Sequence, residues 1–227
     1  NCNAVVNRAE LLTDGNEKDI TTLVAEARCL RAFYYSILVN TYGNVTLTLE
    51  ESSQDPILTP QRNSIEELYT QIIDDLKFAA NNLEDTPYDN NRARVTKKTA
   101  LGLLARVYAQ GGGEYGLTEE GVSYWQRAKE VAEDMILVYG DCLYDDVEDV
   151  WAPANNRNNK EALFIAAGPD ATNLENWNAG TQCNNNFTYM YPKPNTLTIY
   201  PTPDNQNYWY GRTNNNTLAP SKYLLDC

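Results

Sequence analysis

The sequence ITTLVAEARCLRAFYYSILVNTY, residues 20–42, decides the fold class because it carries a long helical period. Apolar residues recur in it at intervals of three and four, which is the spacing of one face of an α-helix. This stripe consists of Ile20, Leu23, Val24, Ala27, Leu30, Tyr34, Ile37, Leu38 and Tyr42. Gly43 follows, where a helix commonly ends in a left-handed residue. The stretch therefore predicts one long helix that stops at Gly43.

Four more helices are predicted around it. A short one covers Ala4–Leu12, and Ser64-Ile65-Glu66-Glu67 forms a capping box that opens a helix running to Leu83. Another begins near Thr96 and is expected to end at the run Gly111–Gly113. The last begins at Ser123, with Gln126 as its capping-box partner, and ends at Gly140.

Successive amphipathic helices joined by short turns pack as antiparallel hairpins. Their spacing here is too irregular for a clean repeat of about 34 residues. We therefore predict an all-α fold, a tetratricopeptide-like stack of helical hairpins with long ordered loops. The helical core covers residues 1–150, and no sheet larger than a short hairpin is expected.

The character of the sequence changes after Trp151. Asparagines cluster at residues 155–159, residues 161–166 are compatible with a short strand, and no sustained period follows. We interpret residues 151–227 as a loop-rich ligand-binding region and the start of a C-terminal part that this sequence lacks. The chain opens inside a helical pattern and stops inside the apolar segment 223–227, which is why we expect a piece of a longer polypeptide.

Composition excludes several partners and reactions. The formal net charge of -13 disfavours binding to nucleic acid or to anionic lipid. The chain has no histidine, which excludes Ser–His–Asp and Cys–His catalysis and histidine-ligated zinc. Its five cysteines include no CxxC pair, so we interpret them as small, buried apolar residues. We expect no cofactor, no metal site and no nucleic-acid partner.

Two groups of acids are the candidates for a hydrolytic site, namely Glu119-Glu120 and the acids of residues 145–149. Glycoside hydrolysis needs two carboxyl groups that face each other across a sugar, one of them with a raised pKa. Clustered surface acids do not normally provide this arrangement. We therefore expect both groups to be solvated, with a cation site as the less favoured alternative, and the chain to be non-catalytic.

Several motifs occur in the order typical of the SusD-like (RagB/SusD) family, which they resemble. They are AEARCLRAFYY at 25–35, YGNV at 42–45, RNSIEELY at 62–69, IIDDL at 72–76, RVTKKTA at 94–100, LARVY at 104–108, the Trp125 helix, KEALF at 160–164 and PSKYLLD at 220–226. Thr46 stands where the family usually has proline, and Ala93 where it has glycine.

The resemblance implies an α/α superhelix that captures nutrients and catalyses nothing. It implies a glycan or peptide ligand, a SusC-like TonB-dependent transporter as partner, and a place on the outer face of a Gram-negative outer membrane. A lipid at the N-terminus would be the link to the membrane. The resemblance also implies that this lipidated cysteine and the family's C-terminal half are absent from this sequence.

Aromatic and amide residues after residue 170 are the candidate binding set. Tryptophan and tyrosine rings stack on the C–H faces of sugars, while amides and guanidinium groups bind hydroxyls. Peptide recognition uses the same groups, and the alternative role for any single ring is to pin a loop to the helices. The candidates are Trp177, Asn178, Tyr189, Tyr191, Tyr200, Tyr208, Trp209, Tyr210 and Arg212, with Asn205 nearby.

Arg28 and Arg31 lie on the helix of residues 20–42 and admit two interpretations. Either they contact ligand, or they form structural ion pairs between helices with Glu26 or Asp75. We favour the second, because arginine suits packed interhelical pairs.

Three functions therefore compete. The first is ligand capture for a transporter, the second is a helical-repeat adaptor that binds another protein, and the third is an acid-only glycoside hydrolase. An exposed aromatic platform would favour capture, whereas a bare groove between helices would favour the adaptor. The sequence leaves glycan and peptide ligands open.

Overall fold

The computed structural model describes residues 1–9, 11–12, 14–51, 59–155 and 159–165. These residues form helices α1 (Cys2–Ala9), α2 (Glu17–Tyr42), α3 (Ile65–Asn82), α4 (Lys97–Tyr115), α5 (Tyr124–Tyr139) and α6 (Val147–Trp151), with short 3-10 helices η1 (Tyr88–Asn90) and η2 (Pro153–Asn155). Strands β1 (Thr118–Glu119) and β2 (Val122–Ser123) form an antiparallel hairpin between α4 and α5. The predicted all-α class is confirmed, since this hairpin is the one sheet in the described residues.

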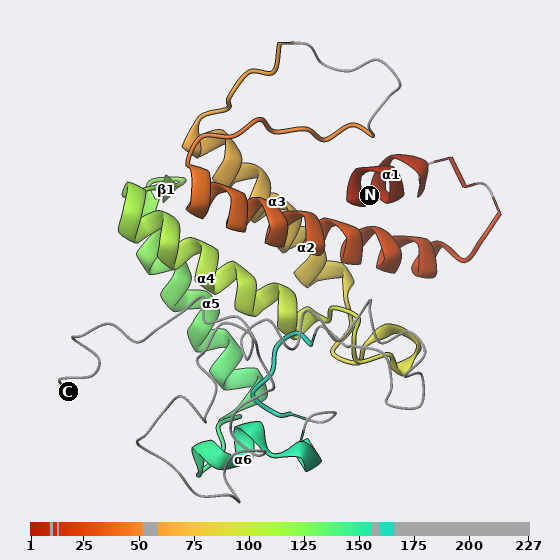
Figure 1. Cartoon of the computed structure of the whole chain (residues 1–227), viewed down its shortest axis with the longest axis vertical. Coiled ribbons are helices and arrows are strands. Elements are labelled where there is room, and N and C mark those ends of the chain that lie inside the picture. Colours follow the sequence, from red (N-terminus) through yellow and green to blue (C-terminus); the bar gives the residue numbers. More distant parts are fainter. Residues whose placement is uncertain (10, 13, 52–58, 156–158, 166–227) are drawn as a thin grey trace, which may run out of the picture. The chain divides into compact units, whose positions relative to one another are not determined.

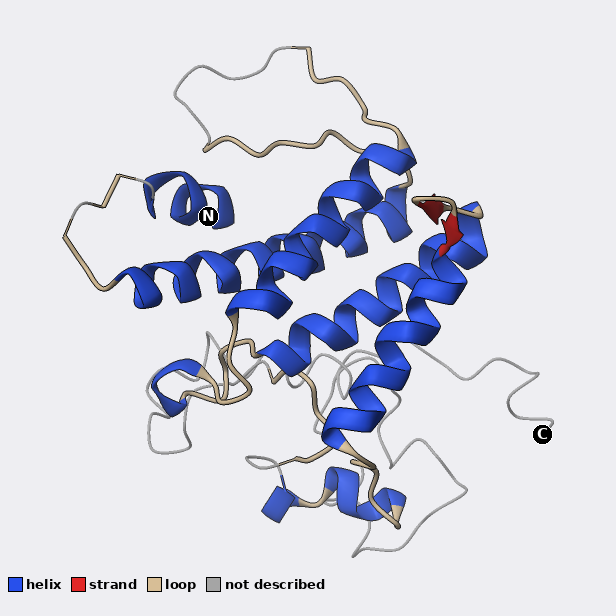
Figure 2. Cartoon of the chain, turned by 180° about the vertical axis from the view of Figure 1, so that it is seen from behind, coloured by secondary structure: helices blue, strands red, loops and turns tan. Residues whose placement is uncertain are grey.

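The helices pack in chain order. Helix α2 contacts α1 and α3, α3 contacts α4, and α4 contacts α5. Successive long helices run in roughly opposite directions, as Figures 1 and 2 show. This is the predicted stack of helical hairpins.

The predicted helix ends agree with the structure at several caps. Ser64 accepts a hydrogen bond from the Glu67 N–H, and the Glu67 carboxylate accepts one from the Ser64 N–H, which completes the capping box of α3. Gly43 and Gly140 follow α2 and α5 with φ of +68° and +70°. Ser123 caps α5, but the Gln126 side chain donates to Glu130 instead of closing a box.

The face that α2 buries differs from the stripe of large apolar residues that gives it its period. Its buried apolar side chains are small, and they recur at helical spacing at Ala25, Cys29, Ala32 and Val39. Tyr34 and Tyr42 of the large stripe are 58% and 71% exposed. Small residues let two helices approach closely, so α3 packs on this face. Burial raises the pKa of the Cys29 thiol to about 12, which fits its interpretation as a small apolar residue.

The prediction that α4 ends at Gly111–Gly113 is wrong, because the helix continues through the three glycines to Tyr115. A Cβ atom on Gly111 would lie 2.8 Å from ring atoms of Tyr69 and Tyr124, and one on Gly112 would lie 2.9 Å from the Trp125 backbone nitrogen. The glycines are therefore needed for close helix packing and do not terminate the helix. Gly116, with φ +62°, is the actual C-cap.

The strand expected from residue 161 is not present in residues 161–165. This segment packs on the helices through its side chains and carbonyls. Leu163 lies against Gly102, where a Cβ would meet it at 2.3 Å, and the Thr99 hydroxyl donates to the Leu163 carbonyl. Phe164 makes an edge contact with Phe33 of α2, with ring centroids 6.2 Å apart. These contacts with α4 and α2 hold the segment in place, so it does not have to pair with a second strand.

Candidate functional site

The predicted ligand-binding residues lie outside the described part of the chain. All of them, from Trp177 to Arg212, follow residue 165. Their arrangement stays a prediction. Within the described residues, the groups that can carry a function are buried ion pairs, partly buried acids and exposed aromatic rings.

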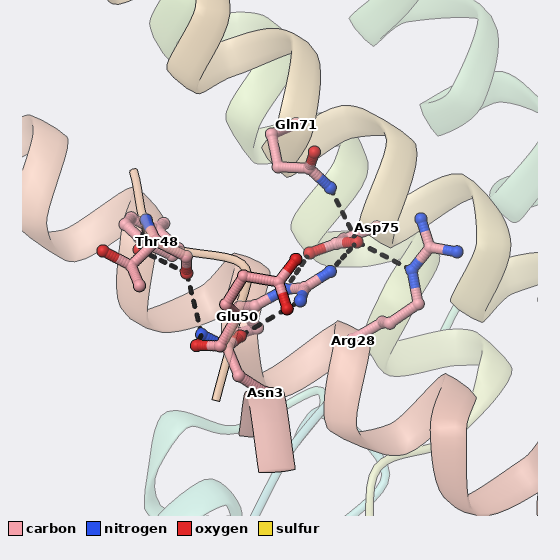
Figure 3. Close-up of polar contacts among 8 residues, drawn as sticks. Asn3, Arg28, Thr48, Glu50, Gln71 and Asp75 are labelled. Carbon is pink, nitrogen blue, oxygen red and sulfur yellow. Dashed lines mark hydrogen bonds and ion pairs between the residues drawn. The ribbon is translucent and has the colours of Figure 1, made fainter. Parts of the chain in front are cut away.

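Asp75 of α3 is the centre of a buried ion-pair network, shown in Figure 3. Its carboxylate accepts hydrogen bonds from Nε of Arg28 at 2.7 Å and from Nε and Nη2 of Arg31 at 2.7 and 2.8 Å. Gln71 Nε2 donates a fourth at 3.0 Å. Asp75 and Arg31 are 1% and 7% exposed as side chains, so neither is available to a ligand in solution. Burial lowers the pKa of Arg31, but the hydrogen bonds to Asp75 and the nearby negative charge together outweigh it, and the net shift is upward.

The same network fixes α1 and the segment after α2. Arg31 Nη1 donates to the Asn3 side-chain oxygen at 3.1 Å. Asn3 in turn donates to the carbonyls of Thr48 and Glu50 at 2.8 and 3.0 Å (Figure 3). The favoured interpretation of Arg28 and Arg31 as structural ion-pair residues is therefore confirmed, with Asp75 as their partner.

Glu26, the other partner considered for these arginines, pairs with a different residue. Its two carboxylate oxygens accept hydrogen bonds from Arg94, which lies just before α4. The Arg94 guanidinium also lies over the Tyr88 ring, 4.8 Å from its centroid. This pair joins the N-terminal half of α2 to the α3–α4 connection, and its charges neutralise each other.

A cavity of about 240 Å³ borders the Glu26–Arg94 pair. It is lined by Lys18, Asp19, Thr22, Glu26, Leu83, Glu84, Thr86, Tyr88 and Val95. Lys18 and Glu84 form an ion pair there at 3.0 Å. Its volume lies below the range of about 300–1,000 Å³ usual for ligand pockets, so it does not suit an oligosaccharide chain.

Glu119 is not the solvated acid that the sequence led us to expect. Its carboxylate accepts hydrogen bonds from Lys77 Nζ at 2.7 Å and from the Tyr108 hydroxyl at 2.8 Å. Burial raises the pKa of Glu119, but these two hydrogen bonds and the positive charges of Lys77 and Arg127 together outweigh it and leave the pKa below its usual value. A general acid needs a raised pKa, so this arrangement opposes catalysis. Glu120 is 86% exposed, as expected.

The acids around α6 are exposed, in agreement with the prediction of solvated carboxylates. Asp145, Asp146, Glu148 and Asp149 are all exposed, and Asp146 caps α6 through the Glu148 N–H at 2.9 Å. The described residues contain no group of three or more acids or cysteines placed to hold a metal ion.

Sequence reasoning missed the exposed aromatic rings of the helical part. Trp151 is 77% exposed and Trp125 57%, and Tyr34 and Tyr42 lie on the open face of α2. Periodicity assigned Trp125, Tyr34 and Tyr42 to helices, where an aromatic ring normally packs inward, and it predicted no helix at Trp151, which ends α6. The acids beside Trp151 were the one available sign that its surroundings are solvated.

Among the described residues, no helix is long and apolar enough to cross a membrane. Residues 1–109 match the model of a SusD-like family described as starch-binding and associating with the outer membrane. A SusD-like protein of Bacteroides ovatus is 33% identical over 167 residues, which are 71% of this chain and 29% of that protein. One of Formosa agariphila is 32% identical over 119 residues, or 52% of this chain and 23% of that protein.

Solved structures agree with these matches. A crystal structure with xylogluco-oligosaccharide shares 30% identity and a TM-score of 0.59 over 72% of this chain and 32% of that one. A laminarin-binding SusD-like protein shares 27% identity and a TM-score of 0.60 over 72% of this chain and 34% of that one. The chain thus spans less than a third of the length of the two curated relatives. Sequence and fold together identify it as a SusD-like protein.

Proposed function

We propose that this protein captures a glycan without cleaving it and delivers it to a SusC-like TonB-dependent transporter. The observation that carries the proposal is the likeness of the described helices to two glycan-associated structures. Their ligands are xylogluco-oligosaccharide and laminarin, and each matches 72% of this chain. The family description as starch-binding favours a glycan over a peptide.

The state of the acids supports a non-catalytic role. Asp75 and Glu26 are saturated by arginines, and the pKa of Glu119 is lowered by its donors. Acid-only glycoside hydrolysis requires two carboxyl groups that are free to face a sugar, and all three of these carboxylates are already engaged by side-chain donors. Their arrangement stabilises the helical stack instead.

We further propose a division of labour along the chain. Residues 1–150 form the tetratricopeptide-like scaffold, and residues 151–227 contribute the binding groups. Trp177, Tyr208, Trp209 and Tyr210 are the proposed stacking rings, with Arg212 as a donor to sugar hydroxyls. Loops carried on a rigid scaffold are a common location for binding residues.

The proposed location is the cell-surface face of the outer membrane, with a lipid anchor at the N-terminus. The family's association with the outer membrane supports the compartment. A protein on that face meets polysaccharides before they reach a transporter, which fits the capture role.

One observation favours a second candidate, the protein-binding adaptor. The open face of α2 exposes large apolar side chains, with Tyr34 58%, Ile37 46% and Tyr42 71% exposed. Exposed apolar faces commonly bind other proteins. Protein binding by this face is compatible with glycan capture, because a capture protein must also contact its transporter.

The test is a binding screen of the full chain by isothermal titration calorimetry against polysaccharides and peptides. We expect saturable binding to at least one polysaccharide. Trp177→Ala or Trp209→Ala should then remove on the order of 1 kcal/mol or more wherever the ring contacts ligand. Leu137→Ala, at a position 84% exposed, is the matched control and should bind like the wild type. Binding to peptides alone would contradict a glycan ligand, and unchanged affinity in both variants would exclude those two positions.

A further inference from the structure

Trp151 is the most exposed aromatic side chain in the described part of the chain, and its backbone is held in place. It ends α6, whose residues Asp149 and Val150 accept hydrogen bonds at their carbonyls from the Asn155 and Asn159 side chains, both at 2.8 Å. An indole with 77% exposure on a fixed backbone presents a flat apolar surface at little conformational cost.

The surroundings of this ring are strongly acidic. Asp141, Asp145, Asp146, Glu148 and Asp149 are all exposed, and no lysine or arginine occurs between residues 130 and 156. Two lysines reach this region: Lys160 lies over the Tyr144 ring at 4.6 Å, and Lys98 Nζ donates to Cys142 Sγ at 3.3 Å. Among the described residues, five exposed acids therefore accompany these two lysines.

We propose that Trp151 is a stacking contact for the captured glycan and that its carboxylate surroundings restrict this glycan to neutral sugars. The inference rests on the proposed function and narrows its ligand class. A pyranose ring places its C–H face on the indole, and its hydroxyls donate hydrogen bonds to the neighbouring carboxylates. A uronate or sialate would bring a like charge within the screening length of about 8 Å at physiological salt.

The helix α6 itself supports an aromatic contact of this kind. Val147 lies one turn before Trp151 on the same face and is 75% exposed, so the apolar surface continues along the helix. Exposed carboxylates at residues 146, 148 and 149 are its neighbours in the sequence, and a sugar likewise combines an apolar ring face with polar edges. An acidic surface also disfavours anionic lipid as the occupant.

The experiment is calorimetric titration of the full chain with laminarin oligosaccharides, xyloglucan oligosaccharides and oligogalacturonates of matched length. We expect the wild type to bind a neutral oligosaccharide and to bind oligogalacturonate at least tenfold more weakly at low salt. Trp151→Ala should weaken neutral binding roughly fivefold, and Trp151→Phe should restore most of it because the ring is kept. The combined change Asp145→Asn and Glu148→Gln should strengthen oligogalacturonate binding.

Melting curves establish that each variant is folded, which an exposed position makes the expected result. Unchanged neutral affinity in Trp151→Ala would overturn the inference while glycan capture stands. Preference of the wild type for oligogalacturonate would overturn the neutral ligand class. If the wild type binds no glycan at all, the proposed function fails and the inference fails with it.

Discussion

Acidic residues are buried and paired at one end of the described helices, and exposed to solvent at the other. Where α1, α2 and α3 meet, Asp75 is 1% exposed and is bonded to two arginines and a glutamine. Around α6, five acids between residues 141 and 149 are exposed to solvent, beside a tryptophan that is 77% exposed. The first end positions helices, whereas the second presents a surface.

This difference shows why acidic residues in one chain have unrelated roles. Burial makes a carboxylate expensive unless it is fully paired, so Asp75 fixes the relative positions of α2 and α3. Solvated acids pay no desolvation penalty, and they act at a distance through their charge. The same contrast holds for apolar residues, since α2 buries small side chains and leaves large ones exposed.

The largest difference between the two ends is expected when one acid is removed from each. Asp75→Ala leaves the buried Arg31 and the partly buried Arg28 without their carboxylate partner, which should cost about 3–5 kcal/mol in the free energy of unfolding. Asp145→Ala removes an exposed acid and should stay within about 0.5 kcal/mol. Urea unfolding measures both. Similar costs in the two variants would show that the Asp75 network does not stabilise the fold.

A smaller effect is expected where α4 and α5 pack. Gly112→Ala places a Cβ 2.9 Å from the Trp125 backbone nitrogen, which cannot move without shifting the helix. We expect a loss of about 1–3 kcal/mol, although alanine is normally the better helix former. Leu137→Ala removes a larger group from the exposed end of α5 and should cost far less. A stabilised Gly112→Ala variant, seen by thermal melting, would contradict this packing.

The smallest effect concerns pH and Glu119. Its folded-state pKa is lowered, so its stabilising effect is complete above the ordinary value of 4.5 and is lost as pH falls through the folded pKa. Glu119→Gln should therefore be less stable than the wild type near neutral pH, and the gap should narrow below pH 4.5. Denaturant unfolding at several pH values measures this gap. A gap that widens on acidification would mean that Glu119 has a raised pKa.

The helices and most of their caps were predictable from the sequence because they depend on local chemistry. Ser64 with Glu67 and the glycines at 43 and 140 act within a few residues of themselves. The choice of Asp75 over Glu26 as partner of Arg28 and Arg31 was not predictable, because it depends on how three helices are placed.

Close packing was the other feature that the sequence could not give. Glycine is common just after the last residue of a helix, so the sequence favoured a helix end at Gly111–Gly113. These glycines lie inside α4 because Tyr124 and Trp125 pack closely against them. Likewise, hydropathy weights large residues, so the face of α2 formed by Ala25, Cys29 and Ala32 was overlooked as its packing face. The predicted binding residues from Trp177 onward remain predictions, as they lie outside the described residues.

The proposed function requires this protein to bind a glycan and to leave it intact. The most direct measurement is a calorimetric titration with laminarin or xyloglucan oligosaccharides, followed by mass spectrometry of the recovered sugar. We predict saturable binding to a neutral oligosaccharide and an unchanged chain length after prolonged incubation. No binding to any glycan, or recovery of shorter products, would contradict the claim.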